Sequence, residues 1–374
     1  CLCTNQKPTY YYQKFAQKEI ENISLVICPK SERSKLVSLM LKSLQGVLPH
    51  GLHWDYIEAI KNLFKIIKLK NNFGKEMINR CPDCFVTVDY PGLNMRLAKM
   101  AHDLKIPVLM YIPPSAWAWH KSRAKKVAKI ADKVAAIFPF EYDVYNEAGA
   151  NTEFVGHPLL DIVKPSMDKN SACNFFGKRE GHPLVAIMPG SRKMEIEKML
   201  PTFLDAAKIL HKRHPEIDFV LPKAETIERS ALEKQIQKTG LDIKITESKN
   251  YDLFSVADLA LATSGTVTLE AAVLGLGSVI CYRTGWFNAL IARLVLNISH
   301  IGLPNIVAGR EVLPELLQEN FTAEKVAQEA EKLLEPERFN QMKNDLEFVK
   351  KRLGKTGAVH RVAELILQTA GAKA

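Results

Sequence analysis

The sequence predicts an α/β protein with parallel sheets. Short apolar runs alternate with amphipathic, charged stretches through most of the 374 residues, as in βαβ units. The apolar runs lack strict alternation of polar and apolar residues, which is typical of strands covered on both faces. Most runs are followed by a stretch with helical spacing. The predicted strands are residues 83–89, 107–112, 133–138, 184–188, 217–221, 242–246, 258–262 and 278–282.

A shift in composition predicts more than one domain, as the length also does. Gly156-His157-Pro158 ends one block, and a polar stretch from Lys164 to His182 precedes the next strand, which we interpret as an interdomain linker. Near the C-terminus, Thr322 is predicted to cap a helix. We expect an N-terminal domain over residues 1–163, a second domain over 180–345 and a C-terminal helical segment over 346–374.

Charge and composition narrow the classes of partner. The chain carries 51 Lys and Arg against 41 Asp and Glu, a net charge of +10, which favours an anionic partner: nucleic acid, a lipid surface or a phosphorylated substrate. No dense basic stripe with interleaved aromatic residues is present, so nucleic acid is not favoured. No secretory signal and no apolar run of about 18 residues occurs, so no transmembrane helix is predicted.

The cysteines predict neither a disulfide framework nor a metal site. The seven cysteines are scattered and odd in number, which favours a reducing compartment. The single Cys81-x-x-Cys84 cannot close a four-ligand zinc site, so we interpret it as two incidental cysteines before a strand. Because the first residue is Cys1 and not Met, we expect the natural start to lie elsewhere.

The most specific candidate site is the Pro189–Arg192 turn, which follows an apolar run and precedes a helical pattern. Such a turn places backbone N–H groups and a helix N-terminus at the edge of a parallel sheet, where phosphate binds. Gly190 and Ser191 would supply the turn, and Arg192 a bidentate guanidinium. The alternative is an ordinary turn with an exposed arginine. Pro201, inside the helical pattern, predicts a kink or a break.

A second candidate site follows the predicted strand at residues 258–262. Ser264, Gly265 and Thr266 are small or hydroxylic residues before a helix that carries Glu270 one turn in. A carboxylate there can accept both hydroxyls of a ribose, so the two sites together predict a nucleotide-diphosphate pocket. The alternative is that Ser and Thr cap the helix and Glu270 interacts favourably with its dipole.

A third candidate lies at the end of the first strong strand. Asp89 leads from that strand into a turn with Asn94, and a carboxylate at a strand's end can act as a general base. The alternative is that Asp89 and Asn94 simply form the turn.

Apolar residues beside basic ones predict contact with a membrane surface. Residues 54–70 form an amphipathic helix with lysines elsewhere around it, as in interfacial helices. The stretch 286–295 is similar, and a loop with Trp117 and Trp119 precedes a Lys/Arg cluster. The alternative is packing within the protein. The predicted membrane-facing side chains are Trp54, Ile57, Ile60, Phe64, Ile67, Trp286 and Phe287.

Several segments, in order and at approximate spacing, resemble the lipid-A-disaccharide synthase family over about residues 55–374. The Trp-Ala-Trp loop and the Leu-Pro-Asn to Ala-Gly-Arg-Glu region are specific to that family, whereas Pro-Gly-Ser-Arg is general among nucleotide-sugar transferases. The matching segments are Pro114–Trp119, Phe138–Glu141, Gly156–Pro158, Pro189–Arg192, Ser264–Glu270, Leu303–Asn305 and Ala308–Glu311.

The resemblance implies a GT-B fold, two Rossmann-like domains facing across a cleft, with the last helix crossing back to the first domain. It implies a metal-free and cofactor-free inverting transfer of diacylglucosamine from UDP to 2,3-diacylglucosamine 1-phosphate, on the cytoplasmic face of the membrane. Asp89 becomes the candidate base and Arg192 the diphosphate clamp. Ser264, Gly265 and Thr266 would line the UDP, Glu270 would hold the ribose, and Asn305 would be a further active-site residue. A homodimer is left open.

The first 53 residues depart from the family pattern. The family opens with a strand and a Gly-Glu-Ala-Ser-Gly-Asp loop, which residues 1–53 lack, and we hypothesise a shifted reading frame or a diverged start. Two alternatives therefore stay open. One is a UDP-sugar 2-epimerase, which shares the fold and the UDP pocket but has no need of an interfacial apolar helix. The other is an inactive remnant that binds UDP or membranes.

Overall fold

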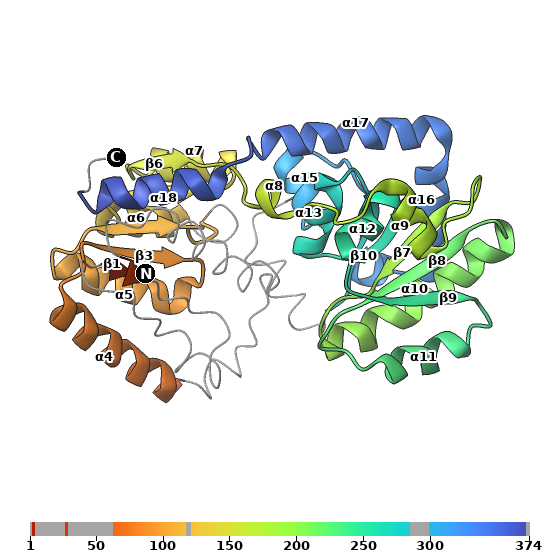
Figure 1. Cartoon of the computed structure of the whole chain (residues 1–374), viewed down its shortest axis with the longest axis horizontal. Coiled ribbons are helices and arrows are strands. Elements are labelled where there is room, and N and C mark those ends of the chain that lie inside the picture. The colour runs from red at the N-terminus through yellow and green to blue at the C-terminus, as the bar shows by residue number, and fades with distance from the viewer. Residues whose placement is uncertain (1, 4–26, 29–62, 117–120, 285–298, 372–374) are drawn as a thin grey trace. The chain divides into compact units, whose positions relative to one another are not determined.

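The computed structural model describes residues 2–3, 27–28, 63–116, 121–284 and 299–371. The chain divides into two compact units (Figure 1). The first combines Cys1–Asp161 with Leu353–Ala374, and the second is Ile162–Arg352. Among the described residues, no helix is long and apolar enough to cross a membrane.

The first unit contains a six-stranded sheet in the order β2-β1-β3-β4-β5-β6. The four strands β3 to β6 are parallel, whereas β1 pairs antiparallel with β3. The strands are β1 (Leu2–Cys3), β2 (Ile27–Cys28), β3 (Cys84–Val88), β4 (Val108–Tyr111), β5 (Lys133–Ala136) and β6 (Thr152–Phe154). The helices are α4 (Leu63–Arg80), α5 (Pro91–Asp103), α6 (Lys121–Ile130), α7 (Pro139–Glu147), α8 (Leu159–Ile162, at the boundary) and α18 (Ala358–Thr369).

Helices cover both faces of this sheet, which explains its continuously apolar strands. Leu93 and Leu97 of α5 pack with Phe85 and Met110 in one buried cluster. The next residue of β4, Tyr111, points to the other face, close to Arg361 of α18. Figure 1 shows α18, in blue, running along the strands.

The second unit contains a fully parallel six-stranded sheet in the order β12-β11-β10-β7-β8-β9. The strands are β7 (Leu184–Met188), β8 (Asp218–Lys223), β9 (Ile243–Glu247), β10 (Leu259–Thr263), β11 (Gly277–Tyr282) and β12 (Glu315–Leu317). The helices are α9 (Lys169–Phe176), α10 (Lys193–Arg213), α11 (Arg229–Gln237), α12 (Asn250–Val256), α13 (Thr266–Val273), α15 (Leu303–Ala308), α16 (Ala323–Leu334) and α17 (Pro336–Arg352), with a 3₁₀ turn at Gln318–Asn320.

All eight predicted strands are present. The four further strands among the described residues are the two-residue β1 and β2, and β6 and β12. The last two lie in the continuously described part of the chain and were not predicted. Both of these, β6 and β12, are three residues long and only partly buried, so neither makes an apolar run. The Thr322 cap is confirmed, since its side chain accepts from the N–H of Lys325.

Two expectations about the second unit are corrected. Of the kink or break predicted at Pro201, the break does not occur, because helix α10 continues through that residue. The polar stretch interpreted as a linker contains α9, because Asp168 caps its N-terminus and Gly177 ends it in a left-handed conformation. Only Ala172 and Phe176 of α9 are buried, so its apolar face is too small to outweigh the polar composition.

The first unit is assembled from two separate chain segments, and hydrogen bonds join them. The N–H of His157 donates to the carbonyl of Leu353 at 2.8 Å, and the N–H of Gly357 donates to the carboxylate of Asp161. The guanidinium of Arg361 donates to the carbonyl of Val155. Val155 and Asp161, on either side of Gly156–Pro158, therefore anchor the start of α18.

Candidate functional site

The Asp89 turn connects β3 to α5 at the carboxyl end of the sheet. The N–H of Asp89 donates to the carbonyl of Tyr111 at 3.2 Å, which extends the pairing with β4 by one residue. Asp89 and Tyr90 then both adopt positive φ angles, 48° and 52°. Two consecutive non-glycine residues in this region are strained, and strain of this kind clusters at functional sites.

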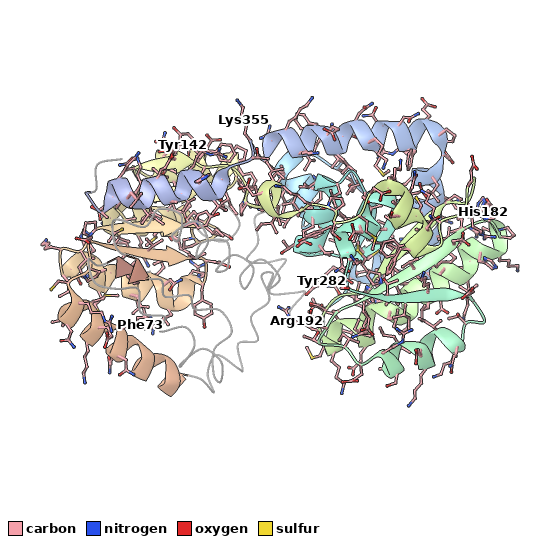
Figure 2. All side chains as sticks on the ribbon, in the orientation of Figure 1. Phe73, Tyr142, His182, Arg192, Tyr282 and Lys355 are labelled. Carbon is pink, nitrogen blue, oxygen red and sulfur yellow. The ribbon has the colours of Figure 1, made fainter. Side chains whose placement is uncertain are left out.

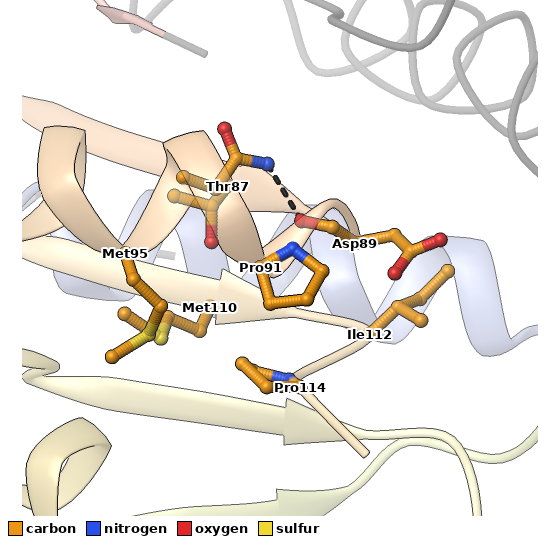
Figure 3. A pocket seen from close by; sticks show the side chains of 8 residues that line it. Thr87, Asp89, Pro91, Met95, Met110, Ile112 and Pro114 are labelled. Atoms are coloured by element: carbon orange, nitrogen blue, oxygen red, sulfur yellow. Dashed lines mark hydrogen bonds between the residues drawn. The ribbon is translucent and has the colours of Figure 1, made fainter. Parts of the chain in front are cut away.

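The carboxyl of Asp89 lies at a small pocket of mostly apolar walls (Figure 3). Burial raises the pKa of Asp89 above its ordinary value, and a hydrogen bond from the N–H of Tyr90 partly offsets the rise. A desolvated carboxylate with a raised pKa is a stronger base than one in water. The residues around the pocket are Thr87, Asp89, Pro91, Asn94, Met95, Met110, Ile112 and Pro114.

The Pro189–Arg192 turn lies in the second unit between β7 and α10. Gly190 has a φ of 112°, and a Cβ there would lie 2.5 Å from Oε2 of Glu195, so glycine is required. The N–H groups of Ser191 and Arg192 both donate to Glu195 Oε2, at 2.9 and 3.2 Å. Glu195 thus closes a capping box at the start of α10.

This geometry corrects one detail of the predicted phosphate site. The backbone donors of Ser191 and Arg192 are already bonded to Glu195, and the Arg192 guanidinium donates to the same carboxylate at 3.3 Å. The Arg192 side chain is 41% exposed, and Figure 2 shows it extending from the ribbon. The Arg192 guanidinium is therefore the donor of this turn that is left partly exposed.

The Ser264–Thr266 turn follows β10, which pairs directly with β7. Carboxyl ends of neighbouring parallel strands meet at one edge of the sheet, so this turn and the Pro189–Arg192 turn share that edge. The N–H of Ser264 donates to the carbonyl of Cys281 at 2.8 Å, and its hydroxyl donates to the carbonyl of Ile301. Gly265 is the N-cap of α13, without a side-chain cap. Capping by Ser or Thr, the predicted alternative, does not occur at this end of α13.

Glu270 is a largely buried carboxyl one turn into α13. Burial raises its pKa to about 7, although a hydrogen bond with the Tyr251 side chain opposes the rise. In return, burial and the nearby Glu270 raise the pKa of Tyr251. Glu270 therefore changes charge near neutral pH, at the same strand–helix unit as Ser264.

Asn305 occupies a different environment from the one the resemblance implies. It is 0% exposed, and its side chain makes four hydrogen bonds within the second unit. Nδ2 donates to the carbonyl of Leu313 and to Glu315, and Oδ1 accepts from the N–H groups of Val312 and Leu313. All four hydrogen-bonding positions of the amide are filled, so Asn305 holds the 301–315 segment together.

Glu315 connects this segment to the Ser264 turn. It accepts from the N–H groups of Ile301 and Gly302, at 2.9 and 3.0 Å, and from Asn305. Because the carbonyl of Ile301 accepts from Ser264, Asn305 and Glu315 fix the backbone against which Ser264 lies.

The predicted membrane-facing side chains cannot be placed. Phe64 and Ile67 belong to α4, whose first turns are described by the backbone alone. Trp54, Ile57, Ile60, Trp286 and Phe287 lie outside the described residues, as do Trp117 and Trp119.

Three residues that support the candidate sites were not predicted from sequence: Glu195, Tyr251 and Glu315. The spacing Arg192-x-x-Glu195 is that of a capping box and could have revealed Glu195. Tyr251 and Glu315 reach their partners through tertiary contacts, for which the sequence carries no local signal.

Within the described part of the chain, no group of three or more His, Cys, Asp or Glu residues could hold a metal ion.

Two solved structures with a similar fold are complexes with UDP-GlcNAc and with UDP. A UDP-GlcNAc 2-epimerase from Neisseria meningitidis, bound to UDP-GlcNAc, matches with a TM-score of 0.56 and 13% identity over 91% of both chains. A UDP complex of Staphylococcus aureus MnaA matches with a TM-score of 0.58 and 14% identity, over 82% of this chain and 81% of that one. At this identity the likeness concerns the fold alone, which is GT-B. The epimerase alternative has no other support.

Comparison of sequences is more specific. The family model described as lipid-A-disaccharide synthetase matches residues 54–368, which include all three candidate sites and exclude the first 53 residues. The lipid-A-disaccharide synthase of Geobacter sulfurreducens is 36% identical over 84% of this chain and 82% of that protein. The enzyme of Trichlorobacter lovleyi is 38% identical over 84% and 80%. The chain thus belongs to the lipid-A-disaccharide synthase family of glycosyltransferases.

Proposed function

We propose that this chain transfers 2,3-diacylglucosamine from its UDP derivative to 2,3-diacylglucosamine 1-phosphate, which yields a β-1,6-linked disaccharide 1-phosphate and UDP. The observation that carries the proposal is the family match over residues 54–368, which spans the Asp89 pocket and the Arg192 and Ser264 turns. The 2-epimerase structures share only the fold, so an isomerase is not proposed.

Asp89 acts as the general base on the acceptor. Its carboxylate takes the proton of the acceptor 6-hydroxyl as that oxygen forms a bond to the anomeric carbon of the donor. The bond between that carbon and the UDP oxygen breaks, so the anomeric configuration inverts and the proton remains on Asp89. The desolvated setting of Asp89, which raises its pKa, supports this role.

The second unit binds the nucleotide that leaves. The exposed Arg192 guanidinium is a bidentate donor for the diphosphate and balances the charge that develops as UDP departs. The Ser264–Thr266 turn and the N-terminus of α13 lie against the phosphates or the sugar. Glu270, in its ionised form, accepts the ribose hydroxyls.

The protein works at the cytoplasmic surface of the membrane, where its acylated substrates reside. The apolar residues of 54–70 and 286–295 contact the bilayer, and the net charge of +10 favours an anionic surface. Flotation with vesicles of phosphatidylglycerol and phosphatidylethanolamine tests this part. Failure to float at low salt, together with full activity in detergent, would remove the membrane contact and leave the chemistry intact.

The decisive experiment is mass spectrometry of products after the purified chain is incubated with both substrates in detergent, beside Asp89→Ala. Disaccharide 1-phosphate and UDP in equal amounts, absent with the variant, are the expected result. A folded protein that binds UDP without forming product would instead support the inactive remnant. Release of UDP with epimerised sugar would support the isomerase.

A further inference from the structure

Asn94 makes an unusual set of contacts with the turn that carries Asp89. Its Nδ2 donates to the carbonyl of Val88 at 3.2 Å and to the carbonyl of Asp89 at 2.6 Å. Its own backbone N–H donates to the carbonyl of Tyr90 at 3.2 Å. Three consecutive carbonyl oxygens therefore accept hydrogen bonds from one residue, itself only 9% exposed. Figure 3 draws the bond to Asp89 as a dashed line.

These carbonyls belong to the part of the backbone that is strained. The positive φ angles of Asp89 and Tyr90 turn the chain sharply between the last residue of β3 and the first residue of α5. Neither residue is glycine, so the turn needs compensating contacts. The amide of Asn94 supplies them from inside α5, one turn after Pro91.

The same carbonyls set the direction of the Asp89 carboxyl. The peptide group between Asp89 and Tyr90 carries both the carbonyl that Asn94 binds and the Tyr90 N–H that bonds to the Asp89 carboxylate. When Asn94 holds the carbonyl of this peptide group in place, the N–H of Tyr90 is kept pointing at the Asp89 carboxylate. The opposite wall of the pocket is also held, because Ile112 adopts a φ of 53° and the hydroxyl of Tyr145 donates to the carbonyl of Pro114.

We propose that Asn94 is a positioning residue for the Asp89 base: it locks the strained 88–90 backbone so that the carboxyl stays desolvated at the edge of the pocket. The inference rests on the proposed role of Asp89. It assigns Asn94 an effect on the rate and pH dependence of transfer, beyond forming the turn.

The test compares three substitutions with a matched control on the same helix. Asn94→Asp keeps the shape but lacks the donors, Asn94→Ala removes the group, and Asn94→Ser retains one donor. Ala101→Gly, at a fully buried position of α5 away from the pocket, destabilises the helix without touching the turn. Full-length proteins are assayed for kcat, KM, the pH profile of kcat and Tm.

We expect Asn94→Asp and Asn94→Ala to lower kcat by about 10- to 100-fold, as misplacement of a catalytic group does, with KM for the UDP donor changed by less than about threefold. In Asn94→Asp the acid limb of the pH profile of kcat should move to higher pH, because a second carboxylate raises the pKa of Asp89. In Asn94→Ala it should move to lower pH, because a loosened, hydrated turn lowers that pKa. Asn94→Ser should be intermediate.

A purely structural role predicts another pattern. If every Asn94 variant kept the wild-type kcat and pH profile while Tm fell as in Ala101→Gly, the inference would be overturned. Should Asn94→Asp and Asn94→Ala fail to fold, Asn94→Ser carries the test alone, and a normal kcat and acid limb would refute it. Asp89→Asn, run alongside, separates the two claims: wild-type kcat there would refute the base assignment itself.

Discussion

The two strand-to-helix turns, one in each unit, use side chains of opposite hydrogen-bonding character. At the Asp89 turn, Asn94 donates to backbone carbonyls. At the Pro189–Arg192 turn, Glu195 accepts from backbone N–H groups. Both residues lie in the first turns of the following helix, and both hold a backbone that includes positive φ angles.

The difference decides which group each turn presents. An amide that binds carbonyls leaves the carboxylate of Asp89 to face the pocket as an acceptor. A carboxylate that binds N–H groups uses up the backbone donors and leaves the guanidinium of Arg192 exposed. The same type of βα turn can therefore present a base or a cation, depending on which residue of the helix closes it.

Among substitutions at these two turns, the one at Asp89 should have the largest effect on activity. Asp89→Asn removes the base and should lower kcat by about 10²- to 10⁴-fold, measured as disaccharide formed by mass spectrometry. UDP affinity, measured by calorimetry, should stay within about twofold. Retention of turnover by a folded variant would end the base assignment.

Arg192 is the corresponding group of the second turn. Arg192→Ala should weaken UDP binding by about 10- to 100-fold, because it removes charge-assisted hydrogen bonds to the diphosphate. The control is Arg179→Ala, an exposed arginine of the same unit that pairs with Asp218. Equal losses in both variants would point to general charge and not to a diphosphate site.

We expect Glu270 to make the proposed nucleotide site sensitive to pH. Its pKa of about 7 in the free protein means that protons compete with the ribose hydroxyls below neutrality. UDP affinity should fall as pH drops below 7, by up to about tenfold per pH unit. Glu270→Gln supplies the baseline for titration of the UDP phosphate itself. If UDP affinity fell as steeply with pH in Glu270→Gln as in the wild type, Glu270 would be excluded as the cause.

The smallest effect is expected at Glu195, the residue that closes the Pro189–Arg192 turn. Glu195→Gln removes a negative charge beside the diphosphate site, but a glutamine can still close a capping box. UDP should bind about two- to fivefold tighter, with Tm changed by only a few degrees. Weaker binding in this variant would show that the Glu195 charge orients Arg192 and does not merely compete with the phosphate.

Periodicity predicted most of the architecture, because each central strand is a continuous buried run such as Leu184–Met188. It missed β6 and β12, whose three residues are partly exposed, and it could not foresee that packing carries α10 past Pro201. Asp89, Arg192 and Glu270 could be proposed as site residues because they stand at a strand end, at the start of a helix or one turn into it. Asn305 is buried in a network of contacts from Leu313 and Glu315, which spacing along the chain does not encode.

The division of the first unit between two segments has a consequence for biosynthesis. Ile162–Arg352 is continuous in sequence, so the second unit can complete its sheet as soon as it leaves the ribosome. The first unit cannot, since α18 covers one face of its sheet and is translated about 190 residues later than Asp161, a gap set by the insertion. Until α18 arrives, apolar strands such as Val108–Tyr111 stay uncovered on the face that α18 occupies. The order of folding is then the reverse of the order of synthesis, and a nascent chain stalled before residue 358 should be a chaperone substrate through its N-terminal half.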